Sequence, residues 1–132
     1  MEGKLLYADL TYTLRGILYS VHNDLGQYKN EKQYADAVGY LLQQKGINYE
    51  REKVLEATFF GEKSRRSQVD FLIESKIILE LKTAPRFIRK DYQQCLRYVT
   101  SARVDLALLV NFRTDSCTIK RILNPDLLNK DP

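Results

Sequence analysis

Apolar residues recur at helical spacing in three stretches of the chain. The first runs from Asp9 to Asp24. The second starts after Asn30, which can cap a helix, and stops at Gly46. The third follows Pro85, which breaks the chain, and continues to about Thr100. These stretches predict three amphipathic helices.

Five shorter stretches favour β-strands. Two of them alternate apolar and polar residues, Val69 to Ile73 and Ile77 to Lys82, and Tyr49 to Phe60 is a strand region of mixed quality. Leu106 to Val110 is a continuous apolar run typical of a buried strand, and Cys117 to Ile122 can pair beside it. The order of two helices, three strands, a helix and two strands (ααβββαββ) predicts an α/β fold with a mixed β-sheet flanked by helices.

A polar turn, Glu74 to Lys76, joins the two alternating strands and decides how their side chains face each other. If the turn is a three-residue loop, Asp70 lies opposite Glu80, with Lys82 two residues farther along on the same face. If it is a two-residue loop, Asp70 lies opposite Leu79, and the two carboxylates point to opposite faces. The register of this hairpin therefore decides whether these residues form a site.

Two carboxylates at a cross-strand distance repel each other when both are ionised, so Asp70 and Glu80 favour a cation between them. Hard oxygen ligands suit magnesium or manganese (Mg2+ or Mn2+), which take further ligands from water and from a substrate phosphate. Lys82 could orient or deprotonate a water there and offset charge on the attacked phosphate. This chemistry is phosphodiester hydrolysis. A bare D-x9-E-x-K pattern is by itself more often an edge-strand charge beside a solvated ion pair.

The composition is that of a single soluble domain, residues 1–132. The chain is 44% hydrophobic and 29% charged, and no apolar run is long enough to span a membrane. Because Met1 to Leu10 also lacks the apolar core of a signal peptide, we expect a cytoplasmic protein. Cys95, Cys117 and the single histidine, His22, are too few for a disulfide framework or a zinc site, so both cysteines are expected to be reduced and packed. Residues 124–132 are expected to form a poorly ordered tail.

Basic residues gather around the proposed site. The net charge is +4, and from Lys82 to Arg103 six basic residues stand against one acid, Asp91. This distribution is typical of a protein that contacts a nucleic-acid backbone, although a solvated helix face without a partner explains it equally well. The residues that we expect to contact phosphates are Arg65, Arg66, Arg86, Arg89 and Lys90.

Four segments resemble, in the same order, the segments of a known family. They are LGQYKNEKQYADAV (Leu25 to Val38), VDFLIESKIILELK (Val69 to Lys82), QQCLRYV (Gln93 to Val99) and LALLVNF (Leu106 to Phe112). Together they resemble the GxxExxY family of the PD-(D/E)XK nuclease superfamily, and the likeness extends from about Leu10 to Ile122. The resemblance implies a restriction-endonuclease-like core and nuclease activity.

The resemblance also implies a metal site with a lysine beside it. Asp70 and Glu80 match the metal-binding carboxylates of the superfamily, and Lys82 matches its catalytic lysine. The backbone carbonyl of Leu81 is a further expected ligand, and Glu31 matches the helical glutamate that can complete the metal site in related nucleases. Without the resemblance, a glutamate in the first turn of a helix is more often a surface residue favoured by the helix dipole.

Other positions match or depart from the family pattern. Gln94 and Tyr98 have the Q-x-x-x-Y spacing of RecB-like nucleases, which puts both side chains on one helical face, and Tyr34 matches the family's tyrosine. Tyr28 replaces the glycine of the pattern, and Asp91 stands where a histidine is usual. The first change can alter the loop before the helical glutamate, because tyrosine resists a positive φ. The second leaves one substrate or proton contact without its usual residue.

The first functional hypothesis is a magnesium-dependent nuclease that hydrolyses phosphodiester bonds of nucleic acid, with DNA favoured over RNA and no membrane partner. Its expected catalytic residues are Asp70, Glu80, Lys82, Gln94 and Tyr98. The alternative is a catalytically weak or inactive nuclease-fold module that binds nucleic acid or protein. The complete Asp, Glu and Lys triplet argues against this alternative, because a scaffold without chemistry has no reason to keep repelling carboxylates together. A domain this small has no obvious specificity element, so activity could depend on a homodimer or on a partner protein.

Overall fold

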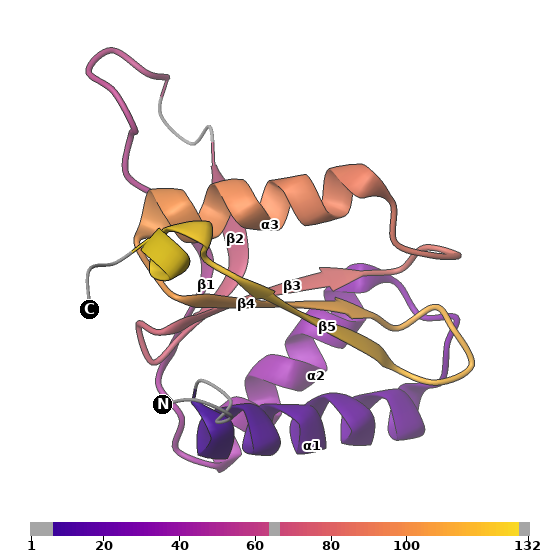
Figure 1. Cartoon of the computed structure of the whole chain (residues 1–132). Helices are drawn as coiled ribbons and strands as arrows, with labels where there is room; N and C mark the ends of the chain where they lie inside the picture. The colour runs from indigo at the N-terminus through magenta and orange to yellow at the C-terminus, as the bar shows by residue number, and fades with distance from the viewer. Residues whose placement is uncertain (1–6, 64–66, 130–132) are drawn as a thin grey trace.

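The helices and strands follow one another in the order expected from the sequence, with one short 3-10 helix added near the C-terminus (Figure 1). The structure, a computed structural model, describes residues 7–63 and 67–129, so the expected phosphate contacts Arg65 and Arg66 lie outside the described residues. The elements are α1 (Ala8–Leu25), α2 (Glu31–Gln44), β1 (Tyr49–Val54), β2 (Gln68–Ile73), β3 (Ile77–Lys82), α3 (Arg89–Ala102), β4 (Leu106–Asn111), β5 (Thr118–Leu123) and the 3-10 helix η1 (Pro125–Asn129).

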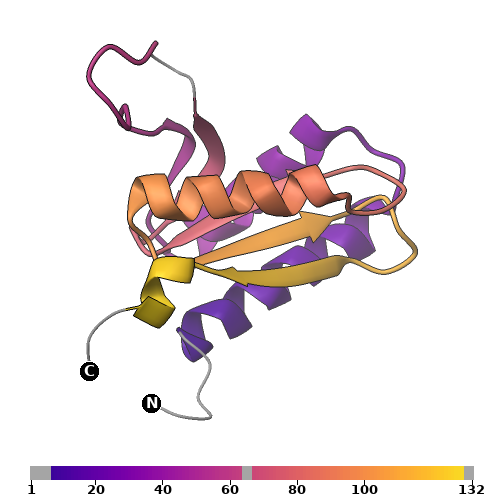
Figure 2. The same ribbon diagram turned by 45° about the horizontal axis from the view of Figure 1, so that its top comes forward.

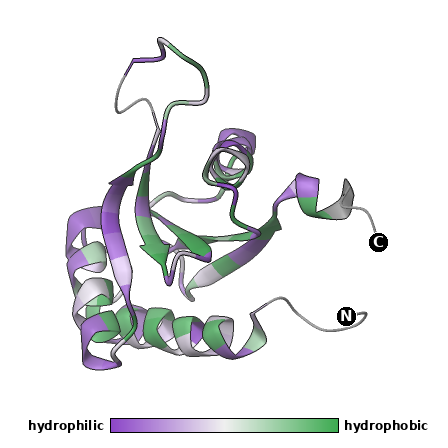
Figure 3. Ribbon diagram, turned by 90° about the vertical axis from the view of Figure 1, so that its left-hand side faces the viewer, coloured by the Kyte–Doolittle hydropathy of each residue, from purple (hydrophilic) through white to green (hydrophobic). Residues whose placement is uncertain are grey.

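The five strands form one mixed sheet in the order β1-β2-β3-β4-β5. Strands β3 and β4 run parallel, because α3 crosses between them, and the other neighbouring pairs are antiparallel. Helices α1 and α2 cover one face of the sheet, and α3 covers the other (Figures 1 and 2). Strand β1, at the edge, is mostly hydrophilic (Figure 3). The prediction of an α/β fold with a mixed sheet flanked by helices is therefore confirmed.

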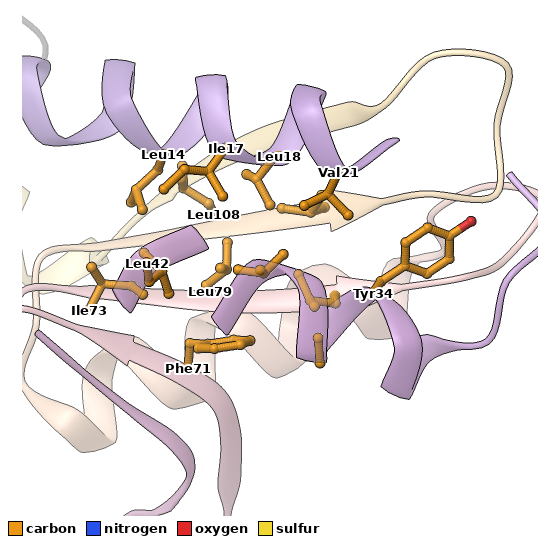
Figure 4. Packing of buried hydrophobic residues seen from close by; sticks show 14 of the residues in the cluster. Leu14, Ile17, Leu18, Val21, Tyr34, Leu42, Phe71, Ile73, Leu79 and Leu108 are labelled. Atoms are coloured by element: carbon orange, nitrogen blue, oxygen red, sulfur yellow. The ribbon is translucent and has the colours of Figure 1, made fainter. Parts of the chain in front are cut away.

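Alternation along β3 directs side chains into two cores, one on each face of the sheet. Leu79 packs with Leu18 and other residues of α1 and α2 (Figure 4). Ile78 points to the other face of the sheet and packs in the second core with Cys95 of α3. Glu80 has the same parity as Ile78, so it also belongs to the α3 face. The buried Glu80 side chain therefore lies on the α3 face of the sheet and not on the face covered by α1 and α2.

The β2–β3 hairpin has the three-residue turn that the site requires. Ile73 pairs with Ile77, and the amide of Lys76 donates to the carbonyl of Ile73 at 2.8 Å. Glu74 and Ser75 both adopt left-handed backbone conformations, with φ of 52° and 56°. Of the two registers that the sequence left open, this is the one that places Asp70 and Glu80 on the same side of the sheet.

Both cysteines are buried and free, as expected from the sequence. Burial raises the pKa of the Cys95 thiol and of the Cys117 thiol to about 12, so both stay protonated at neutral pH. Neither thiol is therefore a nucleophile of the site. In the part of the chain that the structure describes, no helix has the length and apolar character needed to cross a membrane.

The first strand is shorter than the sequence predicted. It ends at Val54 rather than at Phe60. The amide of Leu55 still donates to the carbonyl of Ser67 at 2.9 Å, but residues 56–61 are exposed and have no strand partner among the described residues. The aromatic residues at the end of the stretch suggested a strand, yet they belong to a connection that leaves the sheet.

The segment after β5 also differs from the poorly ordered tail that we expected for residues 124–132. Asn124 is buried, and its Nδ2 donates to the carbonyls of Val99 at 3.2 Å and Val104 at 2.9 Å. Pro125–Asn129 then form the 3-10 helix, while residues 130–132 lie outside the described residues. A single buried amide fixes this segment against α3, and hydrophobic periodicity gives no sign of such a contact.

Candidate active site

The candidate site lies at the edge of the sheet where β3 and β4 end. Ligands of α/β sheets bind at the carboxyl ends of parallel strands, because the connections that leave the sheet there can form a crevice. Three connections meet at this edge, those between α1 and α2, between β3 and α3, and between β4 and β5 (Figures 1 and 2). Because β2 runs antiparallel to β3, Asp70 near the start of β2 lies beside Glu80 near the end of β3.

Each of the two carboxylates accepts a hydrogen bond from a backbone amide of the neighbouring strand. The Asp70 amide donates to Glu80 Oε2 at 2.7 Å, and the Leu81 amide donates to Asp70 Oδ2 at 2.7 Å. Each acid therefore holds one oxygen on the backbone of the neighbouring strand and keeps its other oxygen for a further partner. Because the N–H and C=O of one strand residue face the same neighbour, the Leu81 carbonyl also faces β2.

Burial makes this pair of acids electrostatically costly. Glu80 is only 4% exposed, and burial raises its pKa to about 8, with the Asp70 charge contributing in the same direction. Burial likewise raises the pKa of Asp70, while its bond from the Leu81 amide and the charge of Lys82 oppose the rise. Two acids this close and this buried are stable as a doubly ionised pair only with positive charge beside them.

Helix α3 holds the lysine next to these acids. Lys82 Nζ donates to Gln94 Oε1 at 3.1 Å and lies 3.7 Å from Asp91 Oδ1. Asp91 Oδ2 accepts the amide of Ile88 at 2.9 Å and so caps the helix as well. The aspartate that replaces the usual histidine of the family pattern thus forms an ion pair with the lysine, a contact that the sequence did not predict.

Tyr98 lies one turn beyond Gln94 on α3 and is nearly buried in the α3 core. Burial raises its pKa, and the charge of Glu80 raises it further. The Q-x-x-x-Y spacing therefore brings both side chains toward the site, but in different ways. Gln94 bonds to the lysine, whereas Tyr98 forms part of the apolar wall next to the glutamate.

Glu31, the first residue of α2, faces the site from another side. Burial raises its pKa, the Asp70 charge raises it further, and the Lys82 charge lowers it. Within residues 7–63 and 67–129, however, no three His, Cys, Asp or Glu side chains lie close enough together to hold a metal ion. Glu31 is thus near the acid pair without forming a three-carboxylate cluster with it.

Tyr34 is the residue that fixes the loop leading to Glu31. Its ring is fully buried and stacks on Phe112, with centroids 4.3 Å apart (Figure 4 shows Tyr34). Its hydroxyl donates to the carbonyl of Gly26 and accepts the amide of Lys29. The tyrosine of the family pattern therefore has a positioning role in this chain.

The tyrosine at the glycine position of that pattern does not strain the loop. Tyr28 is not among the described residues that have a positive φ, whereas Gly26 has a φ of 78°. The left-handed turn that we expected to conflict with Tyr28 is made two residues earlier, by a glycine.

Replacing Tyr34 by phenylalanine is expected to destabilise the chain by about 1 to 2 kcal/mol, because the Gly26 carbonyl and the Lys29 amide lose a partly buried hydrogen-bond partner. Urea unfolding measures this effect. Tyr40→Phe is the matched control, because Tyr40 lies on the same helix and is 61% exposed. Equal stability of the Tyr34 and Tyr40 variants would contradict the role given to the Tyr34 hydroxyl.

Asn111 is a site residue that the sequence analysis missed. It ends β4, is 1% exposed, and its Nδ2 donates to the Ala84 carbonyl at 2.7 Å. Its Oδ1 accepts the amides of Ala84 at 3.2 Å and Arg113 at 3.1 Å. One amide side chain therefore joins two of the connections at this edge. A lone polar residue at the end of a continuous apolar strand was the signal that could have revealed it.

The expected phosphate contacts among the described residues lie in the β3–α3 connection and in the first turn of α3. Arg86, Arg89 and Lys90 are exposed, and Arg86 lines a pocket of about 300 Å³ together with Lys82 and Asp91. This pocket opens the lysine to a ligand from outside. Arg86 therefore shares a pocket with the lysine, whereas Arg89 and Lys90 lie in the first turn of α3.

Fold and site together define a nuclease-type α/β domain, with two acids and a lysine at the carboxyl edge of a mixed sheet. The model of the PD-(D/E)XK nuclease superfamily matches residues 8–122, and the chain belongs to that superfamily. No curated protein matches the chain.

Two solved structures share the fold. The crystal structure of SSO0001 has a TM-score of 0.56 and 18% identity, over 90% of this chain and 58% of that one. The alkaline exonuclease LHK-Exo from Laribacter hongkongensis has a TM-score of 0.55 and 11% identity, over 96% of this chain and 74% of that one. The fold is therefore restriction-endonuclease-like. The chain spans less than two thirds of the length of SSO0001.

Proposed function

We propose that this protein is a metal-dependent nuclease of the GxxExxY type that hydrolyses phosphodiester bonds of nucleic acid, with DNA preferred to RNA. The observation that carries the proposal is the cross-bonded pair of buried acids, Asp70 and Glu80, with the Lys82 amine held beside them. A structural domain gains little from such a pair, because each ionised acid disfavours the other.

The residues present fit a divalent cation. The donors are oxygens alone, from Asp70, Glu80 and the Leu81 carbonyl, and this set suits Mg2+ or Mn2+. The high pKa of Glu80 supports the fit, because an adjacent cation would stabilise the ionised form that burial disfavours. Glu31 would be a further ligand, directly or through water. When bound, the ion would lower the pKa of water and offset charge on the attacked phosphate.

Lys82 supplies the positive charge and the proton chemistry on the protein side. Its amine donates to Gln94 and pairs with Asp91, and Lys82 lines the same pocket as Arg86. From there it orients the attacking water and stabilises negative charge that develops on the phosphate. Tyr98 helps to exclude water on the α3 side, and Arg86, Arg89 and Lys90 contact phosphates without reading bases.

A cleavage assay tests this proposal. The purified chain is incubated with linear, circular and single-stranded DNA and with RNA, in magnesium, in manganese and in EDTA. We expect cleavage with either metal, faster on DNA than on RNA, and none in EDTA. Cleavage that survives EDTA would contradict the metal-dependent mechanism. Binding without cleavage on every substrate would favour the alternative, a nuclease-fold binding module.

A further inference from the structure

A second pocket, of about 440 Å³, adjoins the pocket that contains the lysine. It is formed by the α1–α2 connection, the β3–α3 connection and the β4–β5 turn. Tyr28 and Arg113 lie on it, and Asp115 is the acid on its wall. Pro85 lines both this pocket and the pocket of Lys82, so one continuous surface leads from the lysine to Tyr28.

Tyr28 presents a flat and accessible ring on this surface. Its side chain is 78% exposed. The Arg113 guanidinium covers the ring, with its central carbon 5.5 Å from the ring centroid. One side of the ring thus faces a cation, and the high exposure leaves the rest open to a ligand.

The backbone beneath this stacked pair is held in place from several directions. Gln27 Nε2 donates to the Arg113 carbonyl at 3.0 Å, and the Arg113 amide donates to Asn111 Oδ1 at 3.1 Å. His22 Nε2 donates to the carbonyl of Thr114 at 2.9 Å. The two connections that carry Tyr28 and Arg113 are therefore joined to each other and to the end of β4.

We propose that Tyr28 and Arg113 form a stacking platform for an unpaired base of the nucleic-acid strand whose backbone lies at Lys82. The inference rests on the proposed nuclease function and adds the form of the substrate, a single strand or an unpaired end. Aromatic rings backed by arginine bind single strands by stacking on any base, whereas a base inside a duplex has both faces covered by its neighbours.

The charges around the platform favour a base over a phosphate at this position. Arg113 is positive, but Asp115 lines the same pocket and repels a phosphate that approaches its side. A base is neutral, so it is not repelled by either the positive Arg113 or the negative Asp115. Phosphates are attracted more strongly to the neighbouring pocket, where Arg86 lies with the lysine.

Fluorescence anisotropy tests the platform with a labelled single-stranded oligothymidylate and with a duplex hairpin of the same length. Divalent metal is left out, so the test does not depend on cleavage. Tyr28→Ala is expected to weaken single-strand binding about tenfold, which is the size of one lost base stack, and to leave duplex binding unchanged. Tyr28→Phe keeps the ring and is expected to bind like the parent chain. The matched control is Tyr12→Ala, because Tyr12 is 81% exposed on α1, and its binding is expected to stay unchanged.

Three results would overturn the platform: no affinity of the parent chain for the single strand, single-strand binding by Tyr28→Ala equal to the parent, or an equal loss on single strand and duplex. A loss in Tyr12→Ala as large as that in Tyr28→Ala would have the same consequence. Failure of the proposed nuclease function is distinguishable, because it would leave Tyr28-dependent binding intact while cleavage is absent.

Discussion

Replacing Glu80 by glutamine is expected to reduce cleavage about a thousandfold. Glutamine keeps the size of the side chain and an oxygen that can accept the Asp70 amide, so the hairpin stays intact. What disappears is the negative charge that would hold the cation, and metal ions supply several kcal/mol of transition-state stabilisation in such reactions. Initial rates on linear DNA measure the effect. Glu56→Gln is the control, because Glu56 is an exposed acid outside the β2–β3 hairpin and the candidate site, and it should cleave at the parent rate.

When no metal is present, Glu80→Gln should increase the stability of the folded chain, although it reduces cleavage. The pKa of Glu80 rises from 4.5 to about 8 on folding, so between these values the folded chain binds a proton that the unfolded chain has released. The free energy of unfolding of the parent chain therefore falls as the pH rises from about 4.5 to about 8. Glu80→Gln lacks this contribution and should be the more stable chain above pH 8. Stability curves of the two chains that run parallel over this range would contradict the burial argument.

Replacing Lys82 by methionine is expected to lower the turnover rate by about 10²- to 10⁴-fold while magnesium binding is retained. Methionine fills much of the space of the lysine stem but removes the amine that bonds to Gln94. The amine is not a metal ligand, so its loss leaves the oxygen donors unchanged. Single-turnover cleavage and titration calorimetry with Mg2+ separate the two effects. Lys120→Met, an exposed lysine on β5, is the control.

Two results would contradict the role given to Lys82. One is a variant that cleaves at the parent rate. The other is a variant that loses magnesium affinity together with activity, since that would make the lysine a structural support of the metal site rather than a participant in the reaction.

The two strands of the hairpin could be predicted from local rules, but their register could not, because two loop lengths were possible. The alternating residues fix which side of each strand is buried, and the turn then fixes that Ile73 lies opposite Ile77. The order of the elements and the mixed sheet follow from similar patterns in the helices and in β4. The sequence thus identified Asp70 and Glu80 as candidates, and the observed register is what brings them together.

Contacts between distant segments could not be predicted in the same way. The ion pair of Lys82 with Asp91 and the bonds of Asn111 to the β3–α3 connection depend on how α3 and the loops settle on the sheet. Hydrophobic periodicity says which face of a helix is buried but not which polar atoms then meet. The pairing of Tyr28 with Arg113 is of the same kind, since it joins two connections that lie far apart in the chain.

The central claim is that Asp70 and Glu80 stand together in order to hold a divalent cation. Diffraction from crystals soaked in manganese, recorded at the manganese absorption edge, tests it most directly. The proposal predicts an anomalous peak within coordination distance of both carboxylates, present in the parent chain and missing in Glu80→Gln. Crystals of the parent chain without a peak between the two acids, or with an equal peak in the glutamine variant, would contradict it.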